Sequence, residues 1–406
     1  MPSCSRKTGG LAAFSALEED LASTHAGNMI YADYNATTPL DPEVRAAMNE
    51  ALDVSFGNPS SIHSAGQAAR RLLDTARAQV AGLIGAAPDE IIFTSGGTEA
   101  DNLAVLGAVA AASGERKGVI TSAVEHKAVL DPCAYLHKQG HPVTLLPVDG
   151  EGRLDMRALD AAAKPALFSV MLANNDTGTI QPVMEVAQAA KSCGALVHTD
   201  AVQAAGKLPI DVNKLGVSLL SFSSHKIHGP KGAGALYVRR GVRLEPRVHG
   251  GRQERMLRPG TENVPAIVGF GKACELARTR LDADARRVAE MRDLFEKHVL
   301  ARISGTRRNG GLAGRLPNTS NIAFARLEGE AITIHLDMLG MAVSTGAACS
   351  SADQTPSHVL LAMGQTMAEA RSSVRFSFGR DNTDDEIDRA VNLVVQAVKL
   401  LREAQL

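Results

Sequence analysis

The chain has 406 residues, which is more than a single hydrophobic core usually absorbs, so we expect two domains. Its 43 Lys and Arg residues nearly balance 44 Asp and Glu residues, and only 3% of residues are aromatic. These values argue against a nucleic-acid-binding surface, which needs an excess of positively charged side chains and aromatic side chains that stack on bases. No apolar run approaches the ~20 residues that cross a bilayer, so no membrane span is predicted.

The first 28 residues are small, polar and mixed in charge, with only a short, weakly apolar patch after Arg6 and Lys7. That patch is too short and too polar for a signal peptide, so we interpret residues 1–28 as a mobile extension. Five cysteines lie far apart, with no CxxC pair among them: Cys4, Cys133, Cys193, Cys274 and Cys349. This spacing predicts neither a metal site nor a disulfide framework, and it favours a reducing, cytoplasmic location.

From residue 88 onward, short apolar runs alternate with helical stretches. The runs are EIIFTS (90–95), GVITSAV (118–124), PVTLLPV (142–148), ALFSVMLA (166–173), GALVHTD (194–200), VSLLSFS (217–223) and GALYVRR (234–240). This alternation predicts an α/β fold in which a mostly parallel sheet is covered by helices on both faces. A long helix follows, roughly over residues 264–303, and connects to a smaller α+β domain. We place the large domain at residues 38–282 and the small domain at residues 29–37 and 283–406.

Polar residues follow these runs where each strand ends. They are Gly96, Gly97 and Thr98 before a helix, Glu125 and His126, Asn174 and Asn175, Asp200 with Gln203, and His225 with Lys226. Each has an ordinary interpretation: Asp200 could cap a helix, the asparagines could form a turn, and Lys226 could extend to water. Because the carboxyl ends of parallel strands meet at one edge of a sheet, we instead predict that they form one site.

Pyridoxal phosphate is a cofactor that uses such a set together. It needs a lysine for its Schiff base, a carboxylate against its pyridinium nitrogen and hydrogen-bond donors for its phosphate. A lysine near a dry strand end loses its proton more easily and becomes nucleophilic, which suits Lys226. Asp200 supplies the carboxylate, and Ser223 and His225 stand beside Lys226 for the phosphate. A glycine turn that opens a helix, as at Gly97, also suits a phosphate.

Ten motifs in order, from about Met29 to the C-terminus, resemble those of the cysteine desulfurases. These enzymes are fold-type I pyridoxal-phosphate enzymes of the class V aminotransferase group, and the sequence is most similar to their nitrogen-fixation branch. The motifs are YADYNATTPLDP, FGNPSSIHSAG, FTSGGTEADN, VEHKAVL, NNDTG, HTDAVQAAGKLPID, SFSSHKIHGPKGAGALYVRR, RPGTENV, STGAACSSADQTPSHVL and VRFSFGR.

The resemblance implies a role for each residue that matches a family motif. Lys226 would be the Schiff-base lysine, Asp200 would pair with the pyridinium nitrogen, Gln203 would contact the ring hydroxyl, and His126 would stack on the ring and transfer protons. The phosphate would be bound by Gly97, Thr98, Ser223 and His225, and Thr261 would bind the phosphate in the other subunit of a homodimer. The substrate would be bound by Asn35, Asn175 and Arg375.

Cys349 would be the residue that makes this a sulfur enzyme. It lies among small residues in STGAACSSADQ, which is typical of a mobile loop, whereas we interpret the other four cysteines as small structural residues. The resemblance implies that L-cysteine displaces Lys226 from the cofactor and that Lys226 removes the Cα proton. The Cys349 thiolate then takes the sulfur as a persulfide, and alanine leaves. An iron–sulfur scaffold or another acceptor protein would receive the sulfur.

Three alternatives remain open. A selenocysteine lyase shares the fold and most of the motifs. A transaminase of the same fold would have no use for Cys349. A catalytically silent sulfur carrier would not need Lys226, Asp200 and His126 together.

Overall fold

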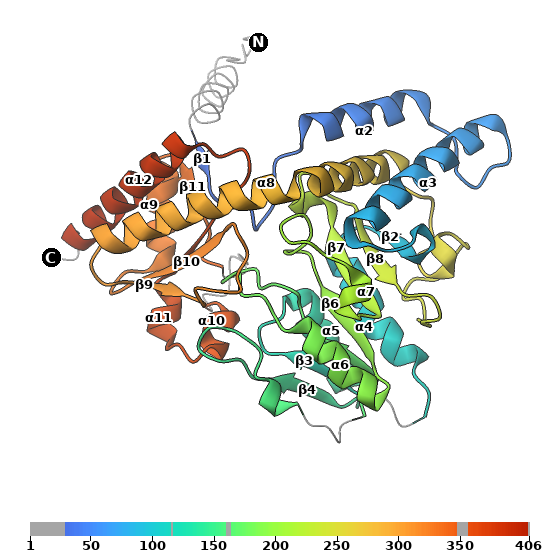
Figure 1. Ribbon diagram of the computed structural model, residues 1–406, viewed down its shortest axis with the longest axis horizontal. Coiled ribbons are helices and arrows are strands. Elements are labelled where there is room, and N and C mark those ends of the chain that lie inside the picture. The colour runs from blue at the N-terminus through green and yellow to red at the C-terminus, as the bar shows by residue number, and fades with distance from the viewer. Residues whose placement is uncertain (1–28, 115–116, 160–163, 347–355, 405–406) are drawn as a thin grey trace, which may run out of the picture.

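The computed structural model describes residues 29–114, 117–159, 164–346 and 356–404 (Figure 1). Its largest sheet has seven strands in the order β2-β8-β7-β6-β5-β3-β4. These strands are β2 (Ile91–Thr94), β3 (Val119–Ser122), β4 (Val143–Leu146), β5 (Leu167–Ser169), β6 (Leu196–Asp200), β7 (Leu219–Ser223) and β8 (Gly234–Val238). β8 pairs antiparallel with β2 and with β7, and the remaining pairs are parallel. The predicted mostly parallel sheet is therefore confirmed.

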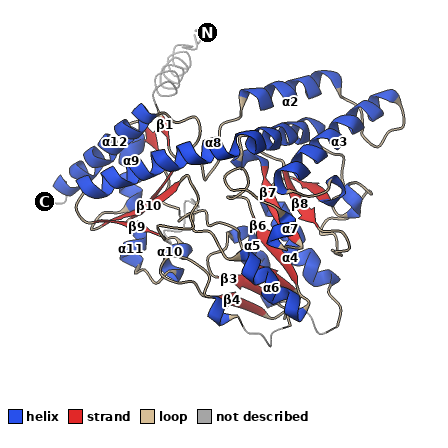
Figure 2. Ribbon diagram, in the orientation of Figure 1, coloured by secondary structure: helices blue, strands red, loops and turns tan. Residues whose placement is uncertain are grey.

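Helices cover both faces of this sheet (Figure 2). Successive side chains of a strand point to opposite faces, so β7 contributes Leu220 and Phe222 to one core and Leu219 to another. The first core also contains residues of α2 (Pro42–Val54), α3 (Ser64–Ile84), α6 (Val183–Cys193), α7 (Val212–Leu215) and α8 (Val264–Arg302). The second core contains residues of α4 (Gly97–Ala111) and α5 (Lys127–Lys138).

β5 is shorter than the eight-residue run that predicted it. The regular strand ends at Ser169, yet the chain continues beside β6, because Val170 N donates to His198 O at 3.1 Å and Leu172 N donates to Asp200 O at 2.8 Å. Asn174 and Asn175 therefore still arrive at the carboxyl edge of the sheet.

A separate core lies under the C-terminal part of the chain. It is built around an antiparallel sheet in the order β12-β10-β9 and a parallel pair, β1 with β11. Residues of both groups contribute to one cluster of buried side chains, which includes Ile30, Phe324 and Phe376. The elements of this core are β1 (Ile30–Tyr31), β9 (Thr306–Asn309), β10 (Thr319–Phe324), α9 (Gly329–Met338), β11 (Met341–Ala342), β12 (Ser373–Ser377) and α12 (Asp384–Glu403). Two short helices, α10 (His358–Ala362) and α11 (Met367–Arg371), belong to a smaller cluster with Val124.

α8, with 39 residues, connects the two parts of the molecule (Figure 1). Its N-terminal half contributes Phe270 to the core of the large sheet, and its C-terminal half contributes Phe295 to the separate core. The predicted long helix is confirmed, whereas the domain boundaries at residues 38 and 283 stay a prediction. Neither α8 nor any other helix in the described part of the chain is long and apolar enough to cross a membrane.

Candidate active site

The predicted residues at the strand ends line a single cavity of about 210 Å³. It lies at the carboxyl edge of the large sheet, where β6 ends at Asp200 and β7 ends at Ser223. The predicted residues that line it are Gly97, Thr98, His126, Asn175, Asp200, Gln203, Ser223, His225 and Lys226. Because parallel strands deliver their ends to one edge, segments more than a hundred residues apart in sequence meet here.

One end of the cavity is suited to an anion. Gly97 and Thr98 begin the 15-residue helix α4, whose first backbone N–H groups have no partner within the helix. Ser223 Oγ lies in the same cavity, is buried, and has no hydrogen-bond partner among the described residues. The backbone is tightly packed here, since a Cβ on Gly234 would lie 2.6 Å from Gly96 Cα. An unpartnered hydroxyl beside a helix N-terminus fits a phosphate group.

Asp200 places a carboxylate at the far end of β6. Its Oδ1 accepts a hydrogen bond from Val202 N at 2.8 Å, which fixes the orientation of the carboxyl group. Burial, followed by the charge of Asp101, raises the pKa of Asp200 to about 7. A buried carboxyl group of this kind gains most from a cationic partner, which a protonated ring nitrogen would supply.

His126 stands at the N-terminus of α5 and faces the same cavity. Its Nδ1 accepts a hydrogen bond from Ala128 N at 3.1 Å, so Nδ1 is unprotonated and the ring proton belongs to Nε2. Helix capping therefore determines the tautomer. The ring remains accessible to solvent, so it can contact a molecule that enters the cavity.

Lys226 lies in a short 3₁₀ turn directly after β7. Its Nζ donates to two backbone carbonyls of an N-terminal segment, Asn35 O and, at 2.8 Å, Ala36 O. Burial, followed by the positive charge of Arg375, lowers the pKa of Lys226 to about 8. A lysine in this position has a substantial fraction of neutral amine near neutral pH, which a nucleophile requires.

Arg375 and Asn175 meet beside this cavity, although they come from different parts of the chain. Arg375 Nη1 donates to Asn175 O at 3.2 Å, and Arg375 Nη2 donates to Asp33 Oδ1 at 2.9 Å. Arg375 Nε is buried and has no partner among the described residues. An unused guanidinium N–H in a buried place fits a carboxylate ligand. Asn35 joins the group, since its Nδ2 donates to Asn175 O at 3.0 Å.

Three of the predicted site residues that the structure describes, Asn35, Arg375 and Thr261, do not line the cavity, although Asn35 and Arg375 lie beside it. Thr261 is exposed. Cys349 lies in residues 347–355, which are outside the described part of the chain.

The cavity and its surroundings contain polar residues that the sequence did not predict. Asp101 lines the cavity, is 1% exposed, and lies 3.4 Å from His198 Nε2 through its Oδ1. Burial raises the pKa of Asp101 to about 7. Asp101 follows Thr98 by three residues on α4, so both side chains lie on one face of the helix. This spacing could have predicted that Asp101 lines the same cavity as Thr98.

Asp176 is a second unpredicted carboxylate, and it links the proposed substrate ligands to one another. Its Oδ1 accepts from Asn175 Nδ2 at 2.8 Å and from Arg375 Nη1 at 3.4 Å. Its Oδ2 accepts from Ser357 Oγ at 2.5 Å, at the N-terminus of α10. No spacing in the sequence indicates these contacts, since Asp176 and Arg375 are 199 residues apart.

The chain is similar to proteins of known family along most of its length. The family model described as aminotransferase class-V matches residues 30–390. A cysteine desulfurase, IscS, of Dictyoglomus turgidum is 48% identical over 375 residues, which is 92% of this chain and 95% of the relative. Among solved structures, a NifS-like protein is similar with a TM-score of 0.86 and 37% identity, over 92% of this chain and 100% of the other.

A further solved structure, described as SspA in complex with cysteine, matches with a TM-score of 0.76 and 35% identity. The match covers 87% of this chain and 100% of the other. The site built from the strand ends thus belongs to a chain that is similar to these enzymes along nearly its whole length. The protein is a member of the class-V aminotransferase family and, within it, of the cysteine desulfurases.

Proposed function

We propose that this enzyme removes sulfur from L-cysteine with pyridoxal phosphate as cofactor and yields L-alanine and a persulfide on Cys349. The observation that carries the proposal is the cavity that Lys226, Asp200 and His126 line together with Ser223, whose hydroxyl has no partner among the described residues. A transaminase would use the same cavity without needing Cys349, and a silent carrier would not need the cavity.

The residues present fit the proposed cofactor. When bound, pyridoxal phosphate supplies an electron sink for negative charge at the substrate Cα. Gly97, Thr98, Ser223 and His225 would hold its phosphate, and Asp200 would pair with its ring nitrogen. Gln203 would contact its ring hydroxyl. The unpartnered Ser223 Oγ and the buried Asp200 carboxylate are the two features that this group would satisfy.

The other residues bind the substrate and move its protons. Arg375 and Asn175 would hold the substrate carboxylate, with Arg375 Nε as the unused donor, and Asn35 would keep Asn175 in place. Lys226 would take the proton from Cα, because its amine is partly neutral near pH 8. His126, with its proton on Nε2, would donate a proton on the open side of the cavity.

Cys349 would be the sulfur acceptor. Its thiolate would form a bond to the substrate sulfur while the bond between that sulfur and Cβ breaks, and the carbon skeleton would leave as alanine after protonation. Two other cysteines are poor candidates because they are buried: burial raises the pKa of the Cys133 thiol to about 12 and that of Cys274 well above its usual value. A thiol that stays protonated is not a nucleophile.

The assembly is also part of the proposal. We place Thr261 against the phosphate in the other subunit of a homodimer, since it is exposed and lies outside its own cavity. An iron–sulfur scaffold or another acceptor protein would then receive the sulfur in the cytoplasm.

Cofactor uptake by the apoprotein is expected to follow the ionisation of Lys226. Only the neutral amine attacks an aldehyde, and the pKa of Lys226 is lowered to about 8 from an ordinary value of 10.5. The rate of pyridoxal phosphate capture should therefore rise about tenfold per pH unit below pH 8 and level off above it. Stopped-flow absorbance of the visible band between pH 6 and pH 10.5 measures this. A rate that keeps rising to pH 10.5 would show an ordinary lysine.

The proposed reaction is tested by alanine formation from L-cysteine, with L-selenocysteine run in parallel. Alanine from L-cysteine supports the desulfurase activity. Alanine from selenocysteine alone would make the enzyme a selenocysteine lyase. A protein that binds no pyridoxal phosphate would exclude both.

A further inference from the structure

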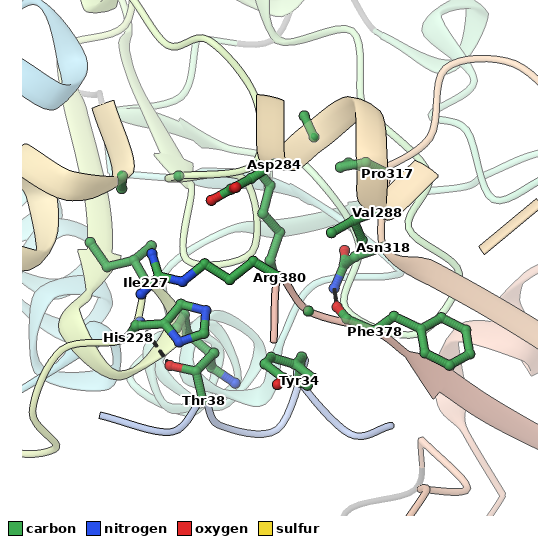
Figure 3. Close-up of a pocket in the computed structure, with 16 residues that line it drawn as sticks. Tyr34, Thr38, Ile227, His228, Asp284, Val288, Pro317, Asn318, Phe378 and Arg380 are labelled. Atoms are coloured by element: carbon green, nitrogen blue, oxygen red, sulfur yellow. Dashed lines mark hydrogen bonds between the residues drawn. The ribbon is translucent and has the colours of Figure 1, made fainter. Parts of the chain in front are cut away.

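Figure 3 shows the residues that line a second cavity, of about 60 Å³, among them Tyr34, His228 and Arg380. Lys226 lines both cavities, and Lys207 lines only the smaller one. The other charged or titratable groups that line the smaller cavity are Tyr34, His228, Asp284 and Arg380. Two lysines therefore line one small cavity beside the proposed reaction centre, and the proposed reaction uses only one of them.

Lys207 contacts two residues of the proposed site directly. Its Nζ donates to Gln203 Oε1 at 2.9 Å and to Asn35 Oδ1 at 3.4 Å. Gln203 is 6% exposed, so its Oε1 has little access to water if the ammonium group is removed, whereas Asn35 Oδ1 also accepts from Asn318 Nδ2 at 2.9 Å. Burial, followed by the positive charges of Lys226 and Arg375, lowers the pKa of Lys207 to about 7 in the protein without cofactor.

These contacts determine which end of the Gln203 amide is the nitrogen. Gln203 Oε1 accepts from Lys207, while Gln203 Nε2 donates to Asn35 O at 2.9 Å. One hydrogen of Nε2 is used by Asn35, and the other is left for a partner in the larger cavity, which Gln203 also lines. Gln203 can therefore only donate to a ring oxygen placed there.

We propose that Lys207 is a positioning residue for the cofactor: it holds the Gln203 amide with its nitrogen toward the ring oxygen and keeps positive charge beside that oxygen and Lys226. This inference rests on the proposed function, since it assigns Gln203 to the ring oxygen. In the loaded enzyme, Lys226 carries no free ammonium and the ring oxygen brings negative charge. Both changes favour the protonated form of Lys207.

The sign of the effect follows from the charges that face Lys226. Beyond burial, the positive charge of Arg375 disfavours a proton on the nitrogen of Lys226, whereas the negative charges of Asp33 and Asp200 favour it. The charges of Lys226 and Lys207 disfavour each other, so a protonated Lys207 is a second positive neighbour of that nitrogen. Loss of the Lys207 charge removes one of the two positive neighbours. The proton shared between this nitrogen and the ring oxygen is then held more strongly, so it leaves at higher pH.

The test is the visible absorption of the holoenzyme as a function of pH, since this band reports the protonation of the Lys226 linkage. In Lys207→Met the midpoint should rise by about one pH unit, a tenfold change in proton affinity. Lys207→Arg keeps the charge and should keep the midpoint within about 0.3 unit of the unchanged protein. Lys214→Met removes the charge of an exposed lysine and should leave the midpoint in place.

Other results would overturn the inference. An unshifted midpoint in Lys207→Met, or equal shifts in Lys207→Arg or Lys214→Met, would show that the charge at Lys207 does not act on the linkage. Lys207→Gln removes the charge and keeps a donor, so it replaces Lys207→Met if that variant does not fold, with the same expected rise. If the unchanged protein forms no visible band with pyridoxal phosphate, the proposed function itself fails; a normal band with unshifted variants rejects only the role of Lys207.

Discussion

Replacing Lys226 with alanine is expected to remove the visible band of the cofactor and to lower alanine formation from L-cysteine by about 10³-fold or more. The residue would supply both the covalent attachment and the base that takes the Cα proton, and no other lysine lines the cavity among the described residues. Absorbance after reconstitution and single-turnover alanine formation measure the two effects separately.

Lys231→Ala is the matched control for this substitution. Lys231 is exposed, lies five residues along the same motif and does not line the cavity, so its removal should leave the band and the rate unchanged. A Lys226→Ala protein that kept a band resistant to dialysis and normal turnover would show that another amine carries the cofactor.

Replacing Cys349 with alanine is expected to leave the visible band intact and to abolish sulfur release from L-cysteine, with a loss on the order of 10³-fold or more. The residues that would bind the cofactor are separate from the residue that would accept sulfur. Lys226→Ala should therefore lose cofactor attachment, whereas Cys349→Ala should lose only sulfur transfer. Mass spectrometry after L-cysteine addition should find a mass increase of one sulfur atom on the unchanged protein and none on Cys349→Ala.

Cys193→Ala serves as the control, because Cys193 ends α6 and does not line the cavity. It should keep both turnover and the persulfide. Full turnover in Cys349→Ala, or persulfide on a different cysteine, would mean that the motif around Cys349 has been misread.

The type of fold, and the sheet edge at which the site lies, could be predicted from the sequence alone. The buried runs of β6 and β7 end in Asp200 and Ser223, and the strand direction is common to parallel neighbours. The local pattern of apolar and polar residues is sufficient for this prediction. A strand that is apolar on both faces must be covered on both faces, so its polar residues lie where the strand ends. The motifs then pointed to the family that the comparisons show.

The contacts between distant segments are visible only in the folded structure. It placed β8 antiparallel between β2 and β7, and it brought Asn35 against Lys226, 191 residues away. It also showed that the titratable groups of Asp101, Asp176 and Lys207 lie beside the predicted residues. Burial and pairing depend on which surfaces meet, and a pKa depends on both, so spacing along the chain carries no information on them. The lysine and its dry strand end were therefore predictable, whereas the charge of Arg375, which lowers the pKa of Lys226 further, was not.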